Sequence, residues 1–119
     1  MTFKEAIVNV LTNYANFSGR ARRSEYWLFC LFTNVVATAL SLLTAVTEAS
    51  FFSVLATLFS LAMFIPGLAV TWRRLHDIGK SGGWYFIALI PLVGAILLLI
   101  WLATDSQSGE NAYGPNPKE

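Results

Sequence analysis

Charged residues are scarce in this chain, and their scarcity restricts the kinds of protein it can be. Only 13% of the 119 residues are Asp, Glu, Lys or Arg, whereas soluble domains carry about 25%. The chain as a whole is strongly apolar, with 55% hydrophobic residues and a mean hydropathy of +0.57. A chain of this length suits one domain, and the composition favours a bilayer over water as its solvent. Because the net charge of +1 gives no basic excess for binding phosphates along a strand, we expect no nucleic-acid partner.

Cysteine and histidine each occur once, which excludes the common disulfide and metal frameworks. Cys30 lies in an apolar run and has no second thiol with which to form an intrachain disulfide or a metal site. His76 is followed by Asp77, but one imidazole and one carboxylate do not make an ordinary zinc site. We therefore expect no metal, no cofactor and no catalytic residue, and we expect that the chain is not an enzyme.

Three long stretches, residues 26–47, 49–72 and 84–104, contain no charged residue. Each has about the twenty residues that an α-helix needs to cross roughly 30 Å of hydrocarbon. Tryptophan favours the membrane interface, and it marks the ends of these stretches independently. The tryptophans at or near the ends are Trp27, Trp72, Trp84 and Trp101. The sequence therefore predicts an all-α membrane protein with three transmembrane helices.

Ionisable residues are also absent from the interior of these stretches, and this absence bears on function. Proton relays, ion pathways and voltage sensors usually carry buried charged groups as their working parts. We therefore do not expect a pump built from a single chain. Pro66 and Pro91 each remove a backbone donor, and we expect each of them to kink its helix.

The segment before the first stretch, residues 1–17, has the periodicity of an amphipathic helix. Its apolar side chains at helical spacing are Phe3, Ile7, Val10, Leu11, Tyr14 and Phe17. Such a helix either lies along the membrane surface in contact with lipid or packs on the cytoplasmic ends of the bundle, and the sequence leaves both alternatives open. The segment lacks the apolar core and cleavage site of a secretory signal, so we expect the first span to stay in the mature protein.

The basic residues are distributed unevenly, and their distribution predicts an orientation. Every Lys and Arg except Lys118 lies either before the first predicted span or in the link 73–83. By the positive-inside rule, the N-terminus and this link face the cytoplasm. Three spans then place the polar tail, residues 105–119, on the outer side together with Glu48.

A few polar side chains within the first two predicted spans fall on one stripe of each helix. Small and hydroxyl-bearing residues let helices approach closely in lipid, and their interhelical hydrogen bonds are worth about 0.6 to 2 kcal/mol. We expect the two stripes to face each other and to serve helix packing. The residues of this predicted packing set are Asn34, Thr38, Ser41, Ser53, Thr57 and Ser60.

Two charged segments are expected to meet at the cytoplasmic membrane face, the Arg-rich motif 18–25 and the link 73–83. Guanidinium groups bind phosphate in a bidentate manner, and each basic residue near an anionic surface contributes about 1 kcal/mol. Glu25 and Asp77 are also within reach of these groups as internal partners. The residues that we predict to bind anionic phospholipid headgroups or a partner protein are Arg20, Arg22, Arg23, Arg73, Arg74, His76, Asp77 and Lys80.

Three ordered motifs, at residues 17–27, 73–77 and 109–118, read FSGRARRSEYW, RRLHD and GENAYGPNPK. Together they strongly resemble the domain-of-unknown-function 805 family of bacterial inner-membrane proteins, over nearly the whole chain. The resemblance implies a small multi-pass protein of the bacterial cytoplasmic membrane, and it offers no activity, cofactor or catalytic residue to carry over. It also implies that the turn at residues 113–115 docks part of the tail on another element.

Three functional hypotheses follow from these observations. The leading one is a non-catalytic membrane module whose Arg-rich cytoplasmic face binds anionic lipid or a partner protein. The second is a subunit of an oligomeric channel or transporter, in which the stripe around Asn34 lines a path between copies of the chain. The third and weakest is an enzyme that acts on lipid headgroups through His76 and Asp77.

Overall fold

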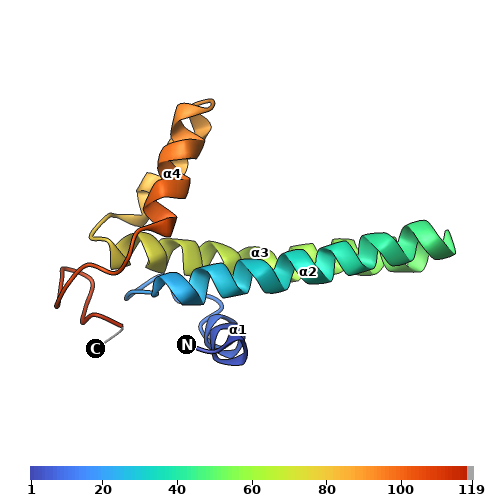
Figure 1. The fold of residues 1–119 in the computed structure, drawn as a ribbon, viewed down its shortest axis with the longest axis horizontal. Helices are drawn as coiled ribbons and strands as arrows, with labels where there is room; N and C mark the ends of the chain where they lie inside the picture. The colour runs from blue at the N-terminus through green and yellow to red at the C-terminus, as the bar shows by residue number, and fades with distance from the viewer. Residues whose placement is uncertain (118–119) are drawn as a thin grey trace.

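The computed structural model describes residues 1–117, which form five helices and no β-strand. The helices are α1 (Phe3–Thr12), α2 (Arg23–Thr47), α3 (Ser50–Asp77), the 3-10 helix η1 (Gly82–Leu89) and α4 (Val93–Ala103). Figure 1 shows α2 and α3 as a long antiparallel pair from which α4 projects at one end. We call that end, where α2 begins and α3 finishes, the polar end. The predicted all-α fold is confirmed, and Lys118 and Glu119 lie outside the described residues.

Helices α2 and α3 are the two described helices long and apolar enough to cross a membrane. At 1.5 Å per residue they measure about 37 and 42 Å, which exceeds the roughly 30 Å of hydrocarbon. Only 6% and 22% of the residues in their most apolar windows are buried within the protein, so lipid must cover the remainder. The predicted span 26–47 lies within α2, and the predicted span 49–72 lies within α3 except for its first residue.

The second of these helices is longer than the sequence predicted. We expected it to end at residue 72, before a loop over 73–83, but α3 continues to Asp77. The charged side chains of its last turn are buried in contacts with other segments, so a solvated loop is not needed to accommodate them. The helix stops where Gly79 adopts a φ of 80°, a left-handed conformation that favours glycine after a helix end.

Residues 84–104, which we predicted as one continuous span, fold as two short helices joined by a turn. Leu92 has φ 63° and ψ −63°, and the Val93 amide donates to the Pro91 carbonyl at 2.7 Å, which closes a three-residue γ-turn. Helix α4 then returns along η1, and neither helix has the length of a span. The expectation of one helix over 84–104 is wrong, because the chain reverses at Leu92, next to Pro91, which has no N–H group to continue the helical hydrogen bonds.

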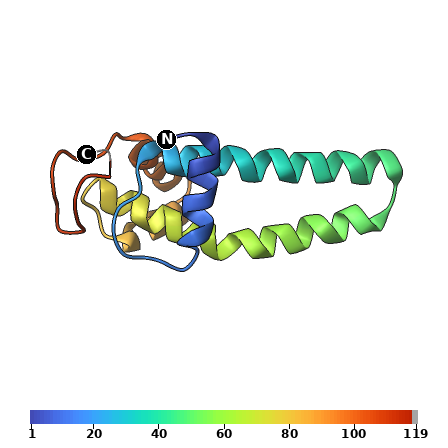
Figure 2. The same ribbon diagram turned by 90° about the horizontal axis from the view of Figure 1, so that it is seen from below.

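The tail beyond α4 returns to the polar end, and this differs from the predicted outer location. The Gln107 amide donates to the carbonyl of Asp77 at 2.9 Å. Figures 1 and 2 both show the tail beside the segment that precedes α2. Asp105 and Glu110 therefore lie at the same end of the molecule as Arg20, because the chain turned back at Leu92 and did not continue as a third span.

Helix α1 crosses α2 and α3 near the polar end (Figure 2). It begins with a capping box in which Thr2 and Glu5 exchange hydrogen bonds, and these bonds lower the pKa of Glu5. Ala6 and Val10 are fully buried against the bundle. Of the two alternatives for this amphipathic helix, packing on the bundle is therefore observed. Lipid contact stays a prediction for its exposed apolar side chains, Phe3, Val8 and Leu11, and for Tyr14 just after it.

Candidate functional site

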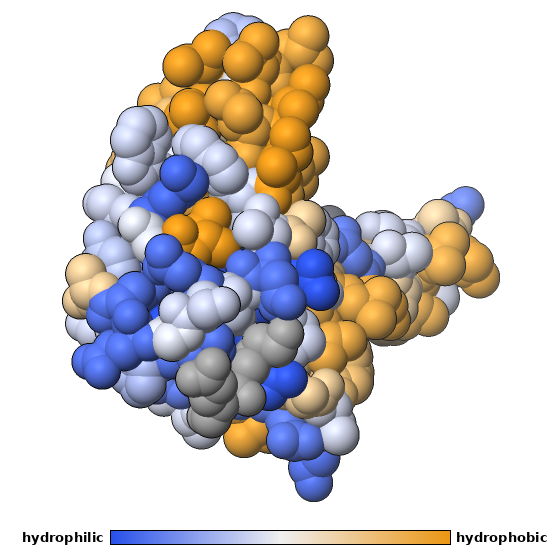
Figure 3. Space-filling view, turned by 60° about the vertical axis from the view of Figure 1, so that its left-hand side comes forward, coloured by the Kyte–Doolittle hydropathy of each residue, from blue (hydrophilic) through white to orange (hydrophobic). Residues whose placement is uncertain are grey.

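The candidate site is at the polar end, where the segment before α2, the last turn of α3 and the tail meet. Two small clusters of buried apolar side chains lie next to this site. One is centred on Phe29 and Val70, and the other on Leu75 and Leu102. Figure 3 shows hydrophilic residues gathered at this end, beside the largely hydrophobic surface of the η1–α4 hairpin.

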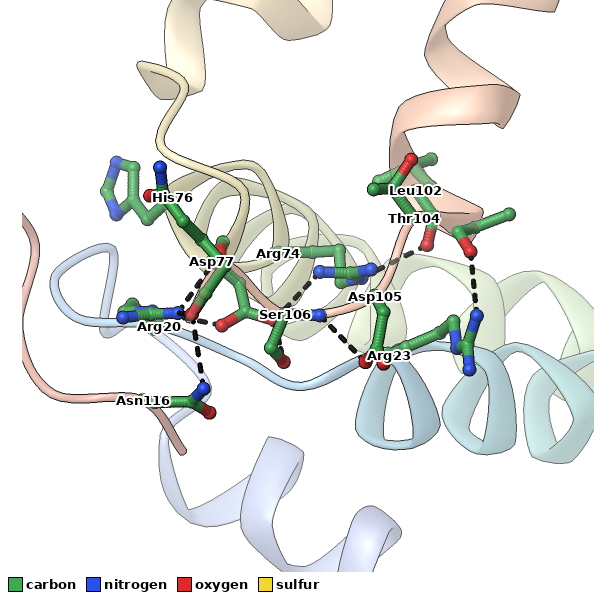
Figure 4. Close-up of polar contacts among 12 residues, drawn as sticks. Arg20, Arg23, Arg74, His76, Asp77, Leu102, Thr104, Asp105, Ser106 and Asn116 are labelled. Carbon is green, nitrogen blue, oxygen red and sulfur yellow. Dashed lines mark hydrogen bonds and ion pairs between the residues drawn. The ribbon is translucent and has the colours of Figure 1, made fainter. Parts of the chain in front are cut away.

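Asp77 is the centre of the site and is fully buried. Its Oδ1 accepts from Arg20 Nε at 3.0 Å, and its Oδ2 accepts from an Nη of Arg74 at 2.9 Å. The Ser106 hydroxyl of the tail also donates to Oδ2 (Figure 4). The side chains of Arg20 and Arg74 are no more than 1% exposed, so both ion pairs are shielded from water.

A second buried ion pair joins α2 to α3. Glu25 accepts from Arg73 at 3.1 Å, and the two side chains are 2% and 4% exposed. The Asn9 amide of α1 donates to the same carboxylate, and Arg73 Nε donates to the Asn16 carbonyl. We refer to Arg20, Glu25, Arg73, Arg74 and Asp77 together as the ion-pair cluster, which connects the N-terminal segment, α2 and α3.

Arg20 holds the tail against the end of α3. Its two Nη atoms donate to the carbonyls of Gly109 at 2.7 Å, Gly114 at 3.2 Å and Gln107 at 2.6 Å. A guanidinium group has five N–H donors, so one arginine can make several such bonds. These three bonds join residues that are 87 to 94 positions apart in the chain. The tail is therefore an ordered part of the site.

His76 adds a second attachment for the tail. Its ring stacks on Tyr113 with centroids 3.9 Å apart, and its Nδ1 lies 2.9 Å from the Gly19 carbonyl. The Asn111 amide donates to the His76 carbonyl at 2.9 Å. The docking of the 113–115 turn that the family resemblance implied is thus present, and the surface that receives it is the last turn of α3.

These contacts occupy most of the residues that we predicted to bind lipid. Arg20, Arg73, Arg74, His76 and Asp77 all make internal contacts, and the two carboxylates that the sequence offered as internal partners are the ones used. A buried charge without a partner costs free energy, so each of these charged groups stays with its internal partner. Their predicted role in binding lipid or a partner protein stays a prediction.

Arg22 and Arg23 behave differently from the ion-pair cluster. With Ser24 and Asp105 they line a small polar pocket at the start of α2, which we call the Arg22–Arg23 pocket. Arg22 Nε and Ser24 Oγ are buried atoms without a hydrogen-bond partner, as are one Nη each of Arg73 and Arg74 in the ion-pair cluster, but Arg22 and Ser24 line the pocket. An Nη of Arg23 donates to the Ala103 carbonyl at 3.2 Å. No side chain caps the N-terminus of α2, so its first amide groups also face this region.

Lys80, the last predicted site residue, lies at the base of η1. Its Nζ is 4.5 Å from the ring centroid of Trp101 and 6.0 Å from that of Trp84. The two indole rings contact each other edge to face at 5.8 Å. The Trp27 indole donates to the Leu102 carbonyl at 2.9 Å, which adds a third ring at this level. Such rings with a cation are typical of a membrane interface.

The six residues of the predicted packing set are all exposed on α2 and α3. Asn34 and Thr57 donate to carbonyls of their own helices, at Cys30 and Ser53. Asn34 and Ser60 line a shallow groove between the two helices, whose other walls are largely apolar. Within one chain α2 and α3 are held by apolar contacts and the ion-pair cluster, and the packing role of the stripes stays a prediction.

Sequence reasoning missed several residues of the site. Ser24 and Asp105 of the pocket, and Ser106, Gln107 and Asn111 of the tail, were not among the predicted site residues. From its composition alone, the tail was predicted to be a polar chain end. Only its resemblance to a family motif indicated that it docks on another element. Within residues 1–117, no group of three or more His, Cys, Asp or Glu side chains could hold a metal ion.

Comparison with known proteins agrees with this architecture. The model of a family described as "Protein of unknown function (DUF805)" matches residues 14–115. The chain is 40% identical over 111 residues to the inner membrane protein YhaI of Escherichia coli K12, covering 93% of each chain. It is 38% identical over 114 residues to the inner membrane protein YhaH of the same strain, covering 93% of this chain and 94% of YhaH. No solved structure matches.

Both relatives are named for the inner membrane, and neither name gives an activity. Together with the two apolar helices α2 and α3, this confirms the predicted location in a bacterial inner membrane. The family match covers the Arg-rich motif, the end of α3 and most of the tail, which are the three segments that build the site. The chain is therefore an inner-membrane protein, and it belongs to the DUF805 family.

Proposed function

We propose that the protein is a non-catalytic inner-membrane module whose polar end binds the phosphate of an anionic phospholipid headgroup in the Arg22–Arg23 pocket. One observation carries this proposal. Arg22 Nε and Ser24 Oγ are buried and have no partner, although donors buried without an acceptor cost free energy. A phosphate oxygen placed in the pocket would accept from both of them.

The chemistry of the pocket suits a phosphate diester. Guanidinium and hydroxyl groups donate to phosphate oxygens, and the uncapped start of α2 favours negative charge. Asp105 lines the same pocket, and its carboxylate disfavours a second negative charge close by. The site therefore favours the single charge of a diester, as in a phospholipid headgroup, over the double charge of a phosphate monoester.

The position of the pocket also supports lipid as the ligand. Arg22 and Arg23 are at the start of α2, one turn before Trp27. Indole rings favour the headgroup level, so the pocket is at the depth where phosphates are found. The orientation of this end toward the cytoplasm, with its anionic inner leaflet, rests on the positive-inside rule and stays part of the proposal.

The buried pairs account for the other charged groups of the predicted set. The side chains of Arg20, Arg73 and Arg74 are nearly inaccessible, so they stabilise the fold and are not offered to a headgroup. His76 and Asp77, which the weakest hypothesis made catalytic, are likewise held by stacking and ion pairs. The geometry thus favours a binding module over a headgroup enzyme.

The proposal is tested by measuring lipid affinity in nanodiscs or by native mass spectrometry with phosphatidylglycerol. With about 1 kcal/mol per basic residue, Arg22→Gln combined with Arg23→Gln should weaken binding about 30-fold. Ser24→Ala removes a donor but no charge, and we expect a loss of about tenfold, in line with a hydrogen bond to a charged group. Lys4→Gln on the exposed face of α1 is the control, because it removes a basic residue that does not line the pocket.

Two results would contradict the proposal. If the charge variants at α1 and α2 weaken binding equally while Ser24→Ala changes nothing, the attraction is diffuse surface charge. If none of the variants changes lipid affinity, no headgroup site exists at the start of α2. Thermal unfolding of each variant in detergent separates lost binding from lost folding.

A further inference from the structure

The η1–α4 hairpin is apolar on every side and has little protein around it. No charged residue occurs from Gly82 to Ala103. The large side chains of the hairpin that are exposed, at up to 79% for Leu89, are Trp84, Phe86, Leu89, Ile90, Leu92, Val93, Ile96, Leu99 and Ile100. Figure 3 shows this surface as a continuous hydrophobic projection beside the polar end. An apolar surface of this extent must be covered by something other than water.

We propose that the hairpin is a re-entrant element. It enters the hydrocarbon of the leaflet that adjoins the polar end, turns at Pro91 and Leu92, and leaves on the same side. The chain then crosses the membrane twice, through α2 and α3, and its tail lies on the same side as its N-terminal segment. The partner of this surface is the acyl region of one leaflet.

The length of the hairpin fits one leaflet. The eight residues of η1 rise about 16 Å at the 2.0 Å per residue of a 3-10 helix. The eleven residues of α4 rise about 16 Å at 1.5 Å per residue. Half of a hydrocarbon core of roughly 30 Å is about 15 Å, so neither arm can cross. Because the hairpin projects at a steep angle from the α2–α3 pair (Figure 1), its tip approaches the midplane when that pair is tilted from the membrane normal, and the length of α2 and α3 beyond roughly 30 Å accommodates such a tilt.

The base of the hairpin has the residues of a membrane interface. Trp84 begins the outward arm and Trp101 closes the return arm, and their rings are in contact. Lys80 lies over both rings, which places its charge where headgroups and water are found. The arms therefore enter and leave the hydrocarbon at one level.

The tip satisfies most of its own backbone groups, as hydrocarbon requires. Pro91 has no N–H group, so it leaves no donor at the reversal. The amides of Ile90, Val93 and Gly94 donate to the carbonyls of Ile87, Pro91 and Ile90, at 3.0, 2.7 and 3.2 Å. A turn built in this way can lie in lipid at low cost.

The return of the chain is held by polar contacts at the base. The Leu102 carbonyl accepts from Arg74 Nε at 3.0 Å and from the Trp27 indole at 2.9 Å. The last turn of α4 is therefore level with the last turn of α3 and the first turn of α2. A third span would carry Leu102 about 30 Å away and would leave the buried Arg74 without this acceptor.

Labelling of single cysteines tests the topology, because Cys30→Ala gives a cysteine-free background in one step. We would place one cysteine by Ala15→Cys before α2, Ser50→Cys at the first residue of α3, or Ser108→Cys in the tail. An impermeant maleimide applied to spheroplasts and to lysed membranes should place Ala15→Cys and Ser108→Cys on one side and Ser50→Cys on the other. Labelling of Ser108→Cys on the same side as Ser50→Cys would establish three spans and overturn the proposal.

A spin label at the tip tests the depth. A nitroxide at Leu89→Cys in liposomes should be relaxed strongly by oxygen and weakly by a water-soluble nickel chelate, as expected near the midplane. The same label at Ala103→Cys, at the base, should show the reverse. High nickel accessibility at the tip would place it in water, and protection from both reagents would place it against protein, so either result overturns the proposal. Neither measurement depends on the headgroup pocket, so this inference and the proposed function can fail separately.

Discussion

Asp77 shows how single residues determine the structure of the polar end. Its carboxylate is shared by Arg20 and Arg74, which come from segments 57 and 3 residues away. Replacing a whole buried ion pair by apolar groups is often neutral, but removing one partner leaves a buried charge uncompensated. The cluster is therefore sensitive to loss of a carboxylate in a way that surface charges are not.

Asp77→Asn should destabilise the protein by about 3–5 kcal/mol, because both guanidinium groups lose their counter-charge while the shape is kept. The measurement is unfolding in detergent, followed by tryptophan fluorescence. Glu48→Gln, an exposed carboxylate at the other end of α2, is the control and should change stability by less than about 0.5 kcal/mol. Equal stability of the two variants would mean that the cluster does not hold the fold.

At this scale the sequence predicts which residues are charged near the membrane but not how they pair. Glu25 and Asp77 were recognisable as internal partners, whereas the assignment of Arg20 to Asp77 and of Arg73 to Glu25 depends on tertiary geometry. The contacts join residues 57 and 48 positions apart, and no local periodicity encodes them. The unpartnered donor at Ser24 could not be found for the same reason.

Among the elements, α2 and α3 were predictable because an uncharged run of the right length has few alternatives in lipid. The hairpin was not, because hydropathy is the same whether an apolar run is straight or folded back. Pro91 was read as a kink, and the signal that distinguishes a reversal from a kink is the contact that Gly94 makes. A Cβ at position 94 would lie 1.7 Å from the Ile87 carbonyl oxygen, so α4 can approach η1 this closely only with glycine there.

Gly94→Ala should change the free energy of unfolding in opposite directions in a continuous helix and in the hairpin. In a continuous helix over 84–104, alanine would stabilise by about 1 kcal/mol through helix propensity. In the hairpin it should destabilise by about 1–3 kcal/mol, since the close approach to Ile87 is lost. Unfolding of the variant and the parent in detergent shows whether the substitution raises or lowers stability.

The control for that variant is Gly67→Ala in α3. A Cβ there would lie 3.8 Å from the Phe29 ring, an ordinary contact, so we expect a neutral or stabilising effect. A stabilising result at both positions would indicate a continuous third helix and would contradict the hairpin.

For the whole molecule, the polar end concentrates the long-range contacts. The ion-pair cluster, the tail and the crossing helix α1 all lie there, while the other halves of α2 and α3 contact each other and lipid. The tail is thus a structural component of the membrane domain, although its composition is that of a loop.

Truncation after Thr104 should therefore destabilise the entire domain and not merely shorten it. Arg20 would lose its carbonyl acceptors at Gln107, Gly109 and Gly114, and each bond to a charged group is worth about 1.5–3 kcal/mol. We expect a loss of about 3 kcal/mol or more in detergent unfolding. Ser108→Ala, which alters an exposed tail side chain and leaves the tail in place, should unfold like the parent. A truncated chain as stable as the parent would show that the tail is dispensable.

The hydrogen bonds from Arg20 to the tail have a consequence for the folding of the newly synthesised chain. Its partner Gly109 is 89 residues later in the chain, so at about 5–20 residues per second the arginine waits roughly 4 to 18 s for it to be synthesised. During that interval α2 and α3 can already insert and Asp77 can pair with Arg20, but the carbonyl acceptors of the tail are still missing. Folding of the polar end can therefore finish only after the tail has been synthesised, and quality-control proteases have a defined interval in which to encounter a form whose tail is not yet bound.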